Sequence, residues 1–349
     1  MNQTALSPTW QRVFAWLMPA LLIAMLPACG IGPQSTMDDA QTAFAANDYR
    51  TARIHLLNLL DNSPNDDAAN LLYARTMLAL GDGLAAQAAI GKISDNGTDD
   101  ATRSALLAHS DIMRGVPQKA IDRLEPIAPE ARNGEMYRML IWAHRENGTL
   151  DDNADLFAEA LERHNDNADL HALVARDAIT RGDDELARTA ATNALARDDD
   201  NYEALLVQAE LQILDEDLTG AKTRYANIAK RYPGHAVPLA NIVGVEIDMG
   251  NYDAAEKLIA QTEAEHPGFP FLQYQKARLA FAREDYRGAN DILQSMPDYV
   301  HDYPPGLVLS AEIAEALGNR EIAIARLERL LAIVPDDETA REKLNGLTR

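Results

Sequence analysis

Apolar residues recur along most of this chain at the three- and four-residue spacing of one face of an α-helix. Leu56, Leu59 and Leu60 follow this spacing near one end, and Leu327 and Leu330 repeat it near the other. Such spacing places the side chains on one stripe, which a helix buries against its neighbours. No alternating apolar and polar run of useful length, the pattern of a half-buried strand, occurs between them. We therefore expect an all-α protein.

Three columns of residues repeat with a period close to 34. The first is an alanine column, whose members lie 33 or 34 residues apart: Ala52, Ala86, Ala120, Ala154, Ala187, Ala221, Ala255, Ala289 and Ala323. Five or six residues before each alanine lies a candidate turn residue: Asn47, Gly81, Gly115, Gly148, Gly182, Glu216, Gly250, Glu284 and Gly318. Seven residues before most turns lies a further alanine: Ala40, Ala74, Ala108, Ala175, Ala209, Ala277 and Ala311. A fixed period of this length indicates a repeat array.

The three columns fit a helix–turn–helix unit. Glycine readily adopts the left-handed conformation that ends a helix, and alanine lets two helices approach closely. Proline stops a helix because it lacks a backbone donor, and Pro64, Pro233, Pro267 and Pro335 close four of the units. The turn that begins at Gly148 is one residue longer than the others.

These units resemble the tetratricopeptide repeat. The resemblance covers nearly all of Met37 to Val334 and implies a right-handed α-solenoid of about nine repeats, assigned to residues 37–335. In that family the first helix of each unit lines a concave face, which is left open for a ligand. Residues 336–349 are charged and helix-prone, and we expect them to form a C-terminal capping helix.

The N-terminal segment carries the pattern of a secretion signal. Arg12 precedes an apolar run from Val13 to Leu26, which is shorter than the roughly 20 residues of a bilayer-spanning helix. The run ends in Leu-Pro-Ala-Cys-Gly, which resembles the lipobox of bacterial lipoproteins and contains the chain's single cysteine, Cys29. The resemblance implies a signal peptide at 1–28, acylation of Cys29 and a short linker within 29–36. The alternative is an ordinary signal, cleaved near Ala28, with an incidental cysteine.

The residue after Cys29 indicates the membrane in which such a lipoprotein is located. Gly30 stands where an aspartate favours retention at the inner membrane in such lipoproteins. The resemblance therefore implies a lipoprotein of the cell envelope, anchored in the outer membrane through its N-terminal lipid and facing the periplasm.

Composition narrows the functional classes. The chain has 54 acidic and 32 basic residues, a formal charge of −22, which argues against a nucleic-acid partner. One cysteine excludes a disulfide framework and a multi-thiolate zinc site. The eight histidines form no metal-ligand motif, and no phosphate loop or nucleophile motif occurs. We expect no metal, no cofactor and no enzymatic activity.

Projection of the repeat places one residue of each unit near the middle of the concave face. This row is unusually basic and aromatic for an acidic chain: Gln41, Arg75, His109, Trp142, Arg176, Glu210, Gly244, Arg278 and Glu312, with Arg138, Arg145, Phe271, Tyr274 and Phe281 beside it. The candidate binding residues are Arg75, His109, Arg138, Trp142, Arg145, Arg176, Tyr274 and Arg278. Arginine offers bidentate contacts and aromatic rings offer stacking faces, so the row suits an acidic peptide, a polypeptide terminus or an anionic glycan. The alternative is that the arginines pair with acids of adjacent repeats and the aromatic rings fill gaps.

The first repeats show a second resemblance. Asp48, Tyr49, Ala52, Leu56, Asn58 and Leu60 match the opening repeat of tetratricopeptide lipoproteins that accompany exosortase (PEP-CTERM) and exopolysaccharide loci. This implies a non-enzymatic scaffold that binds proteins or peptides of an envelope complex for polysaccharide export or biosynthesis. One alternative is an assembly factor or chaperone for outer-membrane or pilus subunits. Another is a glycan-modifying enzyme, but Glu210 and Glu312 lie three repeats apart, too far to act as a catalytic pair.

Overall fold

The structure, a computed structural model, describes residues 35–296, 303–335 and 337–349, and in these ranges it is entirely helical, without strands. Nine antiparallel helix pairs follow one another, and the first six are α1 (Met37–Ala45) with α2 (Tyr49–Asn62), α3 (Asp67–Ala79) with α4 (Gly83–Ile90), α5 (Asp100–Met113) with α6 (Pro117–Leu124), α7 (Gly134–Glu146) with α8 (Asp155–Arg163), α9 (Ala168–Thr180) with α10 (Asp184–Leu195), and α11 (Tyr202–Leu214) with α12 (Leu218–Arg231). The last three are α13 (Val237–Asp248) with α14 (Tyr252–Glu265), α15 (Pro270–Ala282) with α16 (Tyr286–Gln294), and α17 (Pro304–Ala316) with α18 (Arg320–Ile333). The predicted all-α solenoid is confirmed.

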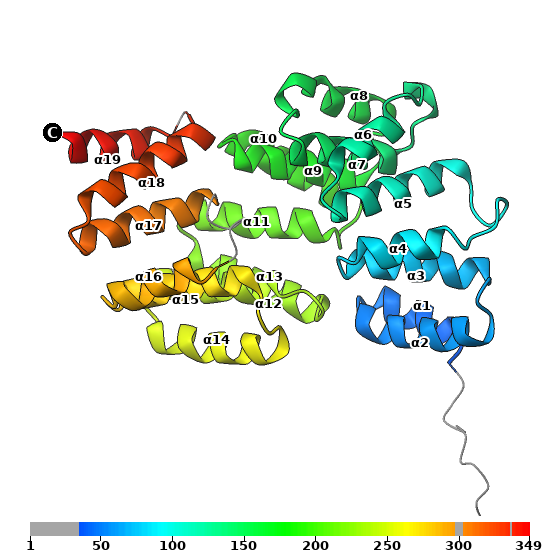
Figure 1. The fold of residues 1–349 in the computed structure, drawn as a ribbon, viewed down its shortest axis with the longest axis horizontal. Helices are drawn as coiled ribbons and strands as arrows, with labels where there is room; N and C mark the ends of the chain where they lie inside the picture. Colours follow the sequence, from blue (N-terminus) through cyan, green and yellow to red (C-terminus); the bar gives the residue numbers. More distant parts are fainter. Residues whose placement is uncertain (1–34, 297–302, 336) are drawn as a thin grey trace, which may run out of the picture.

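The pairs stack into a curved array rather than around one core. In Figure 1 the repeats from α1 to α8 form the right-hand arm, α9 to α11 cross the middle, and α12 to α18 form the left-hand arm. Buried apolar residues form a series of separate clusters, each shared by neighbouring helices. Stability therefore accumulates along the array, as it does in other repeat proteins.

All nine predicted turn residues have positive φ: Asn47, Gly81, Gly115, Gly148, Gly182, Glu216, Gly250, Glu284 and Gly318. In the turn after α9, the N–H of Asp183 donates to the carbonyl of Ala178 at 2.9 Å, the bond that closes a helix through a left-handed residue. Six of the positions are glycine, which adopts this conformation without strain, whereas Asn47, Glu216 and Glu284 adopt it against the preference of an L-residue.

The alanine columns are buried as predicted, with one exception. The alanines seven residues before the turns, together with Ala52, Ala86, Ala120, Ala187, Ala221, Ala255, Ala289 and Ala323, have almost no exposed surface. Ala154 is exposed, so its assignment to the column was wrong. The extra turn residue places a short 3₁₀ turn (Asp151–Asn153) before α8, and Leu150 is buried near α8 in this repeat. One inserted residue rotates a helical position by roughly 100°, which takes Ala154 off the packed face.

A nineteenth helix, α19 (Glu338–Thr348), closes the C-terminal end. The side chain of Asp337 accepts the N–H of Ala340 at 2.8 Å, which satisfies a free donor of its first turn. Ala340, Leu344 and Leu347 pack against apolar residues of α17 and α18. The predicted capping helix is therefore present and covers the apolar side of the last repeat.

The curvature brings the first repeat against repeats far along the chain. The ring of Tyr49, at the start of α2, lies 5.9 Å from that of His235, in the loop between α12 and α13. His235 also lies 4.6 Å from the ring of Tyr202 at the start of α11. The array thus closes one superhelical turn with an aromatic contact between the first repeat and the junction of the sixth and seventh.

Cys29 and the assigned signal peptide at 1–28 lie outside the described residues, so their assignments stay predictions. Within the described ranges, no helix has both the length and the apolar character to cross a bilayer.

Candidate functional site: the concave face

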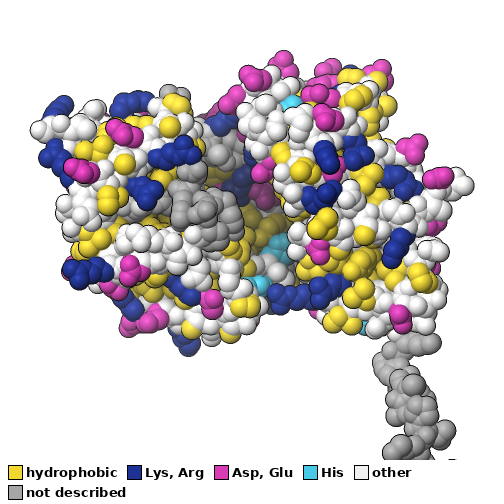
Figure 2. All heavy atoms as spheres, in the orientation of Figure 1, with side chains coloured by type: hydrophobic (Ala, Val, Ile, Leu, Met, Phe, Trp, Pro, Cys, Tyr) yellow, Lys and Arg dark blue, Asp and Glu magenta, His cyan; other side chains and the backbone are white. Residues whose placement is uncertain are grey.

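The first helices of the repeats line the inner face of the curve. Figure 2 shows that the surface is hollowed between the two arms, with apolar and histidine side chains inside the hollow. The mid-face column identified from the sequence lies on these helices, one residue per repeat. The structure divides this column into an N-terminal chamber and two regions of paired charges.

The N-terminal chamber is a cavity of about 560 Å³ built from the first four repeats. Its lining residues are Phe44, Tyr49, Arg75, Leu78, Ala79, Thr102, Ala105, Leu106, His109, Asn133, Glu135 and Arg138. Aliphatic side chains of α3 and α5 supply apolar walls, and the polar groups come from α3, α5 and the start of α7. A cavity with apolar walls and a few convergent polar groups is the usual form of a binding site.

The two arginines of the chamber differ in their pairing. Arg138 donates to both carboxylate oxygens of Glu135, from Nε at 2.9 Å and from Nη2 at 2.7 Å. Burial opposes ionisation of Glu135, but the Arg138 charge and hydrogen bonds outweigh it, and the pKa of Glu135 is lowered. Arg75 is exposed and forms no ion pair within the described part of the chain. Arg75 is therefore the cation of the chamber that is free to take a ligand carboxylate.

His109 is held in its neutral form. Burial, reinforced by the nearby Arg138 charge, lowers the pKa of His109 to about 4. Its ring lies 5.2 Å from that of Trp142, which belongs to the next repeat and donates from Nε1 to Glu146 at 3.2 Å. At neutral pH this pair offers a neutral aromatic surface at the edge of the chamber.

Arg145 occupies a position that is apolar in most other repeats. Three residues before the other turns stand Phe44, Leu78, Ile112, Ile179, Ile213, Ile247 and Phe281, and Glu315 in the last repeat is the exception. Arg145 is half-buried, and its Nη2 has no hydrogen-bond partner among the described residues. The stem of an arginine can replace aliphatic packing at such a position while its head group stays polar.

The middle of the face carries a cluster of paired charges. Arg176 of α9 donates to Glu210 of the next repeat, with Nη2 2.9 Å from Oε1, and also pairs with Glu203 at the start of α11. Burial would favour the neutral guanidine, but the two carboxylates outweigh it, and the pKa of Arg176 is raised. Here the sequence-based alternative, arginines paired with acids of the adjacent repeat, describes the geometry.

The next repeats follow the same principle. Arg278 of α15 donates to Asp248 of α13 at 2.5 Å and to Gln275 at 3.0 Å. Gly244 makes room for this contact, because a Cβ there would lie 3.0 Å from the Nη1 of Arg278. Arg278 is thus held by an acid of the preceding repeat and by a residue of its own helix.

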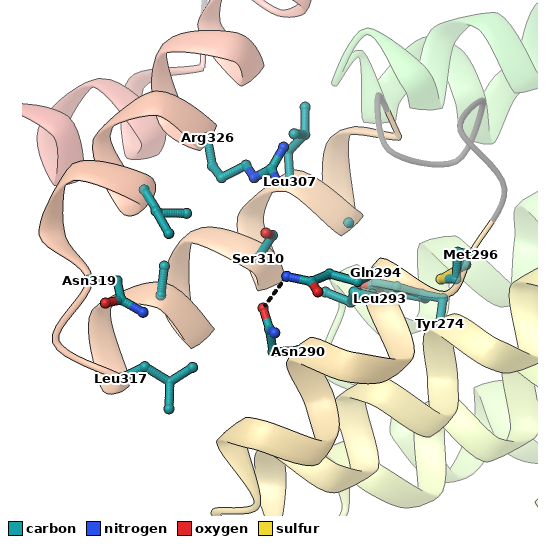
Figure 3. Close-up of a pocket in the computed structure, with 13 residues that line it drawn as sticks. Tyr274, Asn290, Leu293, Gln294, Met296, Leu307, Ser310, Leu317, Asn319 and Arg326 are labelled. Carbon is teal, nitrogen blue, oxygen red and sulfur yellow. Dashed lines mark hydrogen bonds between the residues drawn. The ribbon is translucent and has the colours of Figure 1, made fainter.

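Tyr274 lies in an aromatic group on the same helix. Its ring stacks on Phe271 at 5.9 Å and meets the edge of Tyr303 at 5.5 Å. Burial raises the pKa of Tyr274 to about 12, so its hydroxyl stays protonated. The other side of Tyr274 borders a small pocket of about 170 Å³ between α15, α16, α17 and α18, shown in Figure 3. Its polar lining side chains include Asn290, Gln294, Ser310, Asn319 and Arg326, and Gln294 donates to Asn290 at 3.4 Å.

The structure therefore separates the eight candidates. Arg75, His109 and Arg138 line one cavity, and the ring of Trp142 lies tilted against that of His109. Within the described ranges, Arg138, Arg176 and Arg278 are each paired with a carboxylate, whereas Arg75 is not. The sequence did not identify Thr102, Asn133 and Glu135 as chamber residues. Glu135 carried a signal that could have been found, because it lies three residues before Arg138 on one helical face. Among the described residues, no three His, Cys, Asp or Glu side chains gather closely enough to hold a metal ion.

Comparisons with known proteins identify the fold. No protein-family model matches the chain, and no curated protein sequence matches it. Among solved structures, the Cut9–Hcn1 hetero-tetramer of the APC/C has a TM-score of 0.58 at 14% identity, over 88% of this chain and 68% of that chain. A tetratricopeptide repeat protein from Parabacteroides merdae has a TM-score of 0.52 at 20% identity, over 69% of this chain and 96% of that one. At these identities the likeness establishes the fold alone, a tetratricopeptide-repeat solenoid.

A third structure is more distant. Pseudomonas aeruginosa pilF has a TM-score of 0.41 at 20% identity, over 61% of this chain and 97% of that one. This likeness is too low to bear on what the present chain does.

Proposed function

We propose that this tetratricopeptide-repeat solenoid is a non-enzymatic scaffold, anchored to the bacterial outer membrane through Cys29 and facing the periplasm, that binds proteins or peptides of an envelope complex on its concave face. The complex is proposed to serve polysaccharide export or biosynthesis, on the resemblance of the first repeat. The membrane address rests on the lipobox-like segment around Cys29. Neither nucleic acid nor a cofactor enters the proposal.

The N-terminal chamber is the observation that carries the binding role. Its size, its apolar walls and the free charge of Arg75 suit an extended peptide that presents a carboxylate. Arginine binds carboxylates through charge-assisted hydrogen bonds, which contribute about 1.5–3 kcal/mol each. Arg176 and Arg278 are already paired, so we assign them to repeat packing and place partner recognition in the chamber.

Site-specific photo-crosslinking tests the proposal directly. A photo-reactive amino acid at Ala79, which lines the chamber and is exposed, should capture a partner in envelope membranes that contain the acylated full chain. The matched control is the same amino acid at Ala88, exposed on α4 and outside the chamber. Equal capture from the two positions would contradict a partner in the chamber.

A charge reversal adds specificity to the experiment. Arg75→Glu should abolish capture from Ala79 without a loss of helicity, because Arg75 pairs with no acid in the described residues. Arg287→Glu is the control, since Arg287 is exposed on α16 and is likewise outside any ion pair in the described ranges. A captured species that resists protease but is destroyed by periodate would instead identify an anionic glycan as the ligand.

A further inference from the structure

The outer face of α2 exposes large apolar side chains. Ile54 is 56% exposed and Leu57 is 47% exposed, and they lie one helical turn apart. Ala52 and Leu56 of the same helix are fully buried on the opposite side, so the exposed pair is not a part of the repeat core. Neighbouring exposed apolar side chains can form a contact surface for another molecule or a membrane, although exposed apolar residues also occur elsewhere on this protein, such as Leu84 and Leu214.

The first described residue places the N-terminal segment against this helix. The Oγ of Ser35 accepts a hydrogen bond from Nδ2 of Asn58 at 3.1 Å and lies 3.1 Å from Nδ1 of His55. Asn58 immediately follows Leu57, so Ser35 sits beside the exposed pair. Five residues lie between Cys29 and Ser35, and the six chain steps that join the two residues span at most about 20 Å. A lipid on Cys29 would therefore be attached within about 20 Å of Ser35, the residue that contacts α2.

Charge makes α2 suitable for a bilayer surface. The whole chain has a formal charge of −22, but α2 itself holds two arginines against one acid, Asp61. Arg50 lines a pocket with Glu265, so Arg53 is the cation next to the exposed pair. Arg53 is exposed beside Ile54. Arginine can extend its guanidinium to lipid phosphates while its stem lies among apolar groups, and anionic headgroups attract such residues.

We propose that Arg53, Ile54 and Leu57, the bilayer-facing surface of α2, rest on the membrane that holds the lipid of Cys29. This inference depends on the proposed acylation of Cys29. In Figure 1, α2 forms the lower edge of the right-hand arm, so a bilayer against it lies edge-on to the view. The hollow of Figure 2 then opens parallel to the membrane and remains accessible to a partner in the periplasm.

Depth-dependent fluorescence quenching tests the contact in the full acylated chain. Because acylation consumes Cys29, a Leu57→Cys variant has one free thiol, which is labelled with the environment-sensitive dye NBD. The chain is reconstituted in vesicles of phosphatidylethanolamine and phosphatidylglycerol, with and without lipids that carry a nitroxide on the acyl chain. We expect severalfold stronger quenching at position 57 than at a Leu186→Cys control on α10, where the native leucine is 45% exposed.

Further variants separate the two proposals. Mass spectrometry of the mature chain detects or excludes the thioether lipid on Cys29, and this result decides acylation independently of quenching. With acylation intact, equal quenching at 57 and 186 overturns the α2 contact. Ile54→Glu in the labelled chain should lower quenching at 57 without a change in acylation, and quenching that persists also overturns it. NBD emission that shifts with protein concentration in the absence of vesicles would show a second copy on α2 and likewise overturn the bilayer contact.

Discussion

The left-handed turn residues permit a prediction whose sign reverses between neighbouring repeats. Gly182 has a φ of 76°, and an ideal Cβ added there would have nothing within 4 Å. Gly182→Ala therefore introduces backbone strain without a clash. The strain of an L-residue in this conformation is about 1–2 kcal/mol, and the lost freedom of the unfolded chain offsets about 0.4–1 kcal/mol of it. We expect a net destabilisation of about 1 kcal/mol.

The next turn carries the opposite case. Glu216 has a φ of 60°, its side chain is exposed, and no hydrogen bond or ion pair involves that side chain within the described part of the chain. Glu216→Gly removes this backbone strain, but the glycine gives the unfolded chain more conformational freedom, which offsets a part of the gain. We therefore expect a stabilisation of up to about 1 kcal/mol. In the double variant each repeat should keep its own change, and because the two changes have opposite signs their sum should be close to zero.

Native-state hydrogen exchange of the amides that flank each turn measures these changes locally, because a repeat array need not unfold in one step. Gly346→Ala is the control, since Gly346 lies in α19 without a positive φ and its Cβ would also meet nothing within 4 Å. Helix propensity favours alanine there, so this variant should not lose stability. The reasoning is refuted if Glu216→Gly lowers local stability as much as Gly182→Ala does.

Three further predictions concern packing and charge. Gly83→Ala would place a Cβ 2.7 Å from the carbonyl oxygen of Ser110, so α4 and α5 must move apart. Urea denaturation should show that the free energy of unfolding falls by about 1–3 kcal/mol. An unchanged urea midpoint would contradict the close approach of the two helices. The pKa of His109 is lowered from 6.5 to about 4 in the folded chain. As the pH falls below 6.5, the histidine is therefore protonated in the unfolded chain but not in the folded one. The free energy of unfolding should be highest above about pH 6.5 and should fall by up to about 3 kcal/mol towards pH 4. His109→Gln should remove this part of the pH dependence of the urea midpoint, and an unaltered profile would show that His109 is not its source. Arg176→Met leaves two carboxylates of α11 unpaired and should destabilise the junction of α9 and α11 by about 2 kcal/mol. Hydrogen exchange of the α11 amides measures this loss. Exchange protection equal to that of the parent protein would show that the ion pairs do not contribute to stability.

The arrangement of the concave face could be predicted from the sequence only in part. The period located Arg75, Arg176 and Arg278 on the first helices of their repeats, where the structure has them. It did not distinguish the free Arg75 from the other two, which are paired with acids. An arginine is paired only where a carboxylate of an adjacent repeat lies within ion-pair distance of its guanidinium. That distance depends on the rotation between successive repeats.

The irregular fourth repeat has a packing arrangement that the sequence pattern did not predict. The extra residue after Gly148 was visible, and an alanine lay at the expected place in the alignment. Ala154 is nevertheless exposed, because the inserted residue changes the face of the helix on which it lies. Alignment columns report spacing along the chain, whereas packing responds to the angle around the helix.

The helices, their left-handed turns and the alanine contacts within and between neighbouring repeats follow from the sequence pattern alone. These features depend on interactions among residues at most about one period apart, so a repeating pattern specifies them locally. The chamber, which draws on four repeats, and the contact of Tyr49 with His235 depend instead on the tertiary structure. Such contacts arise where small rotations between repeats add along the array, and their sum brings together residues that no local pattern relates.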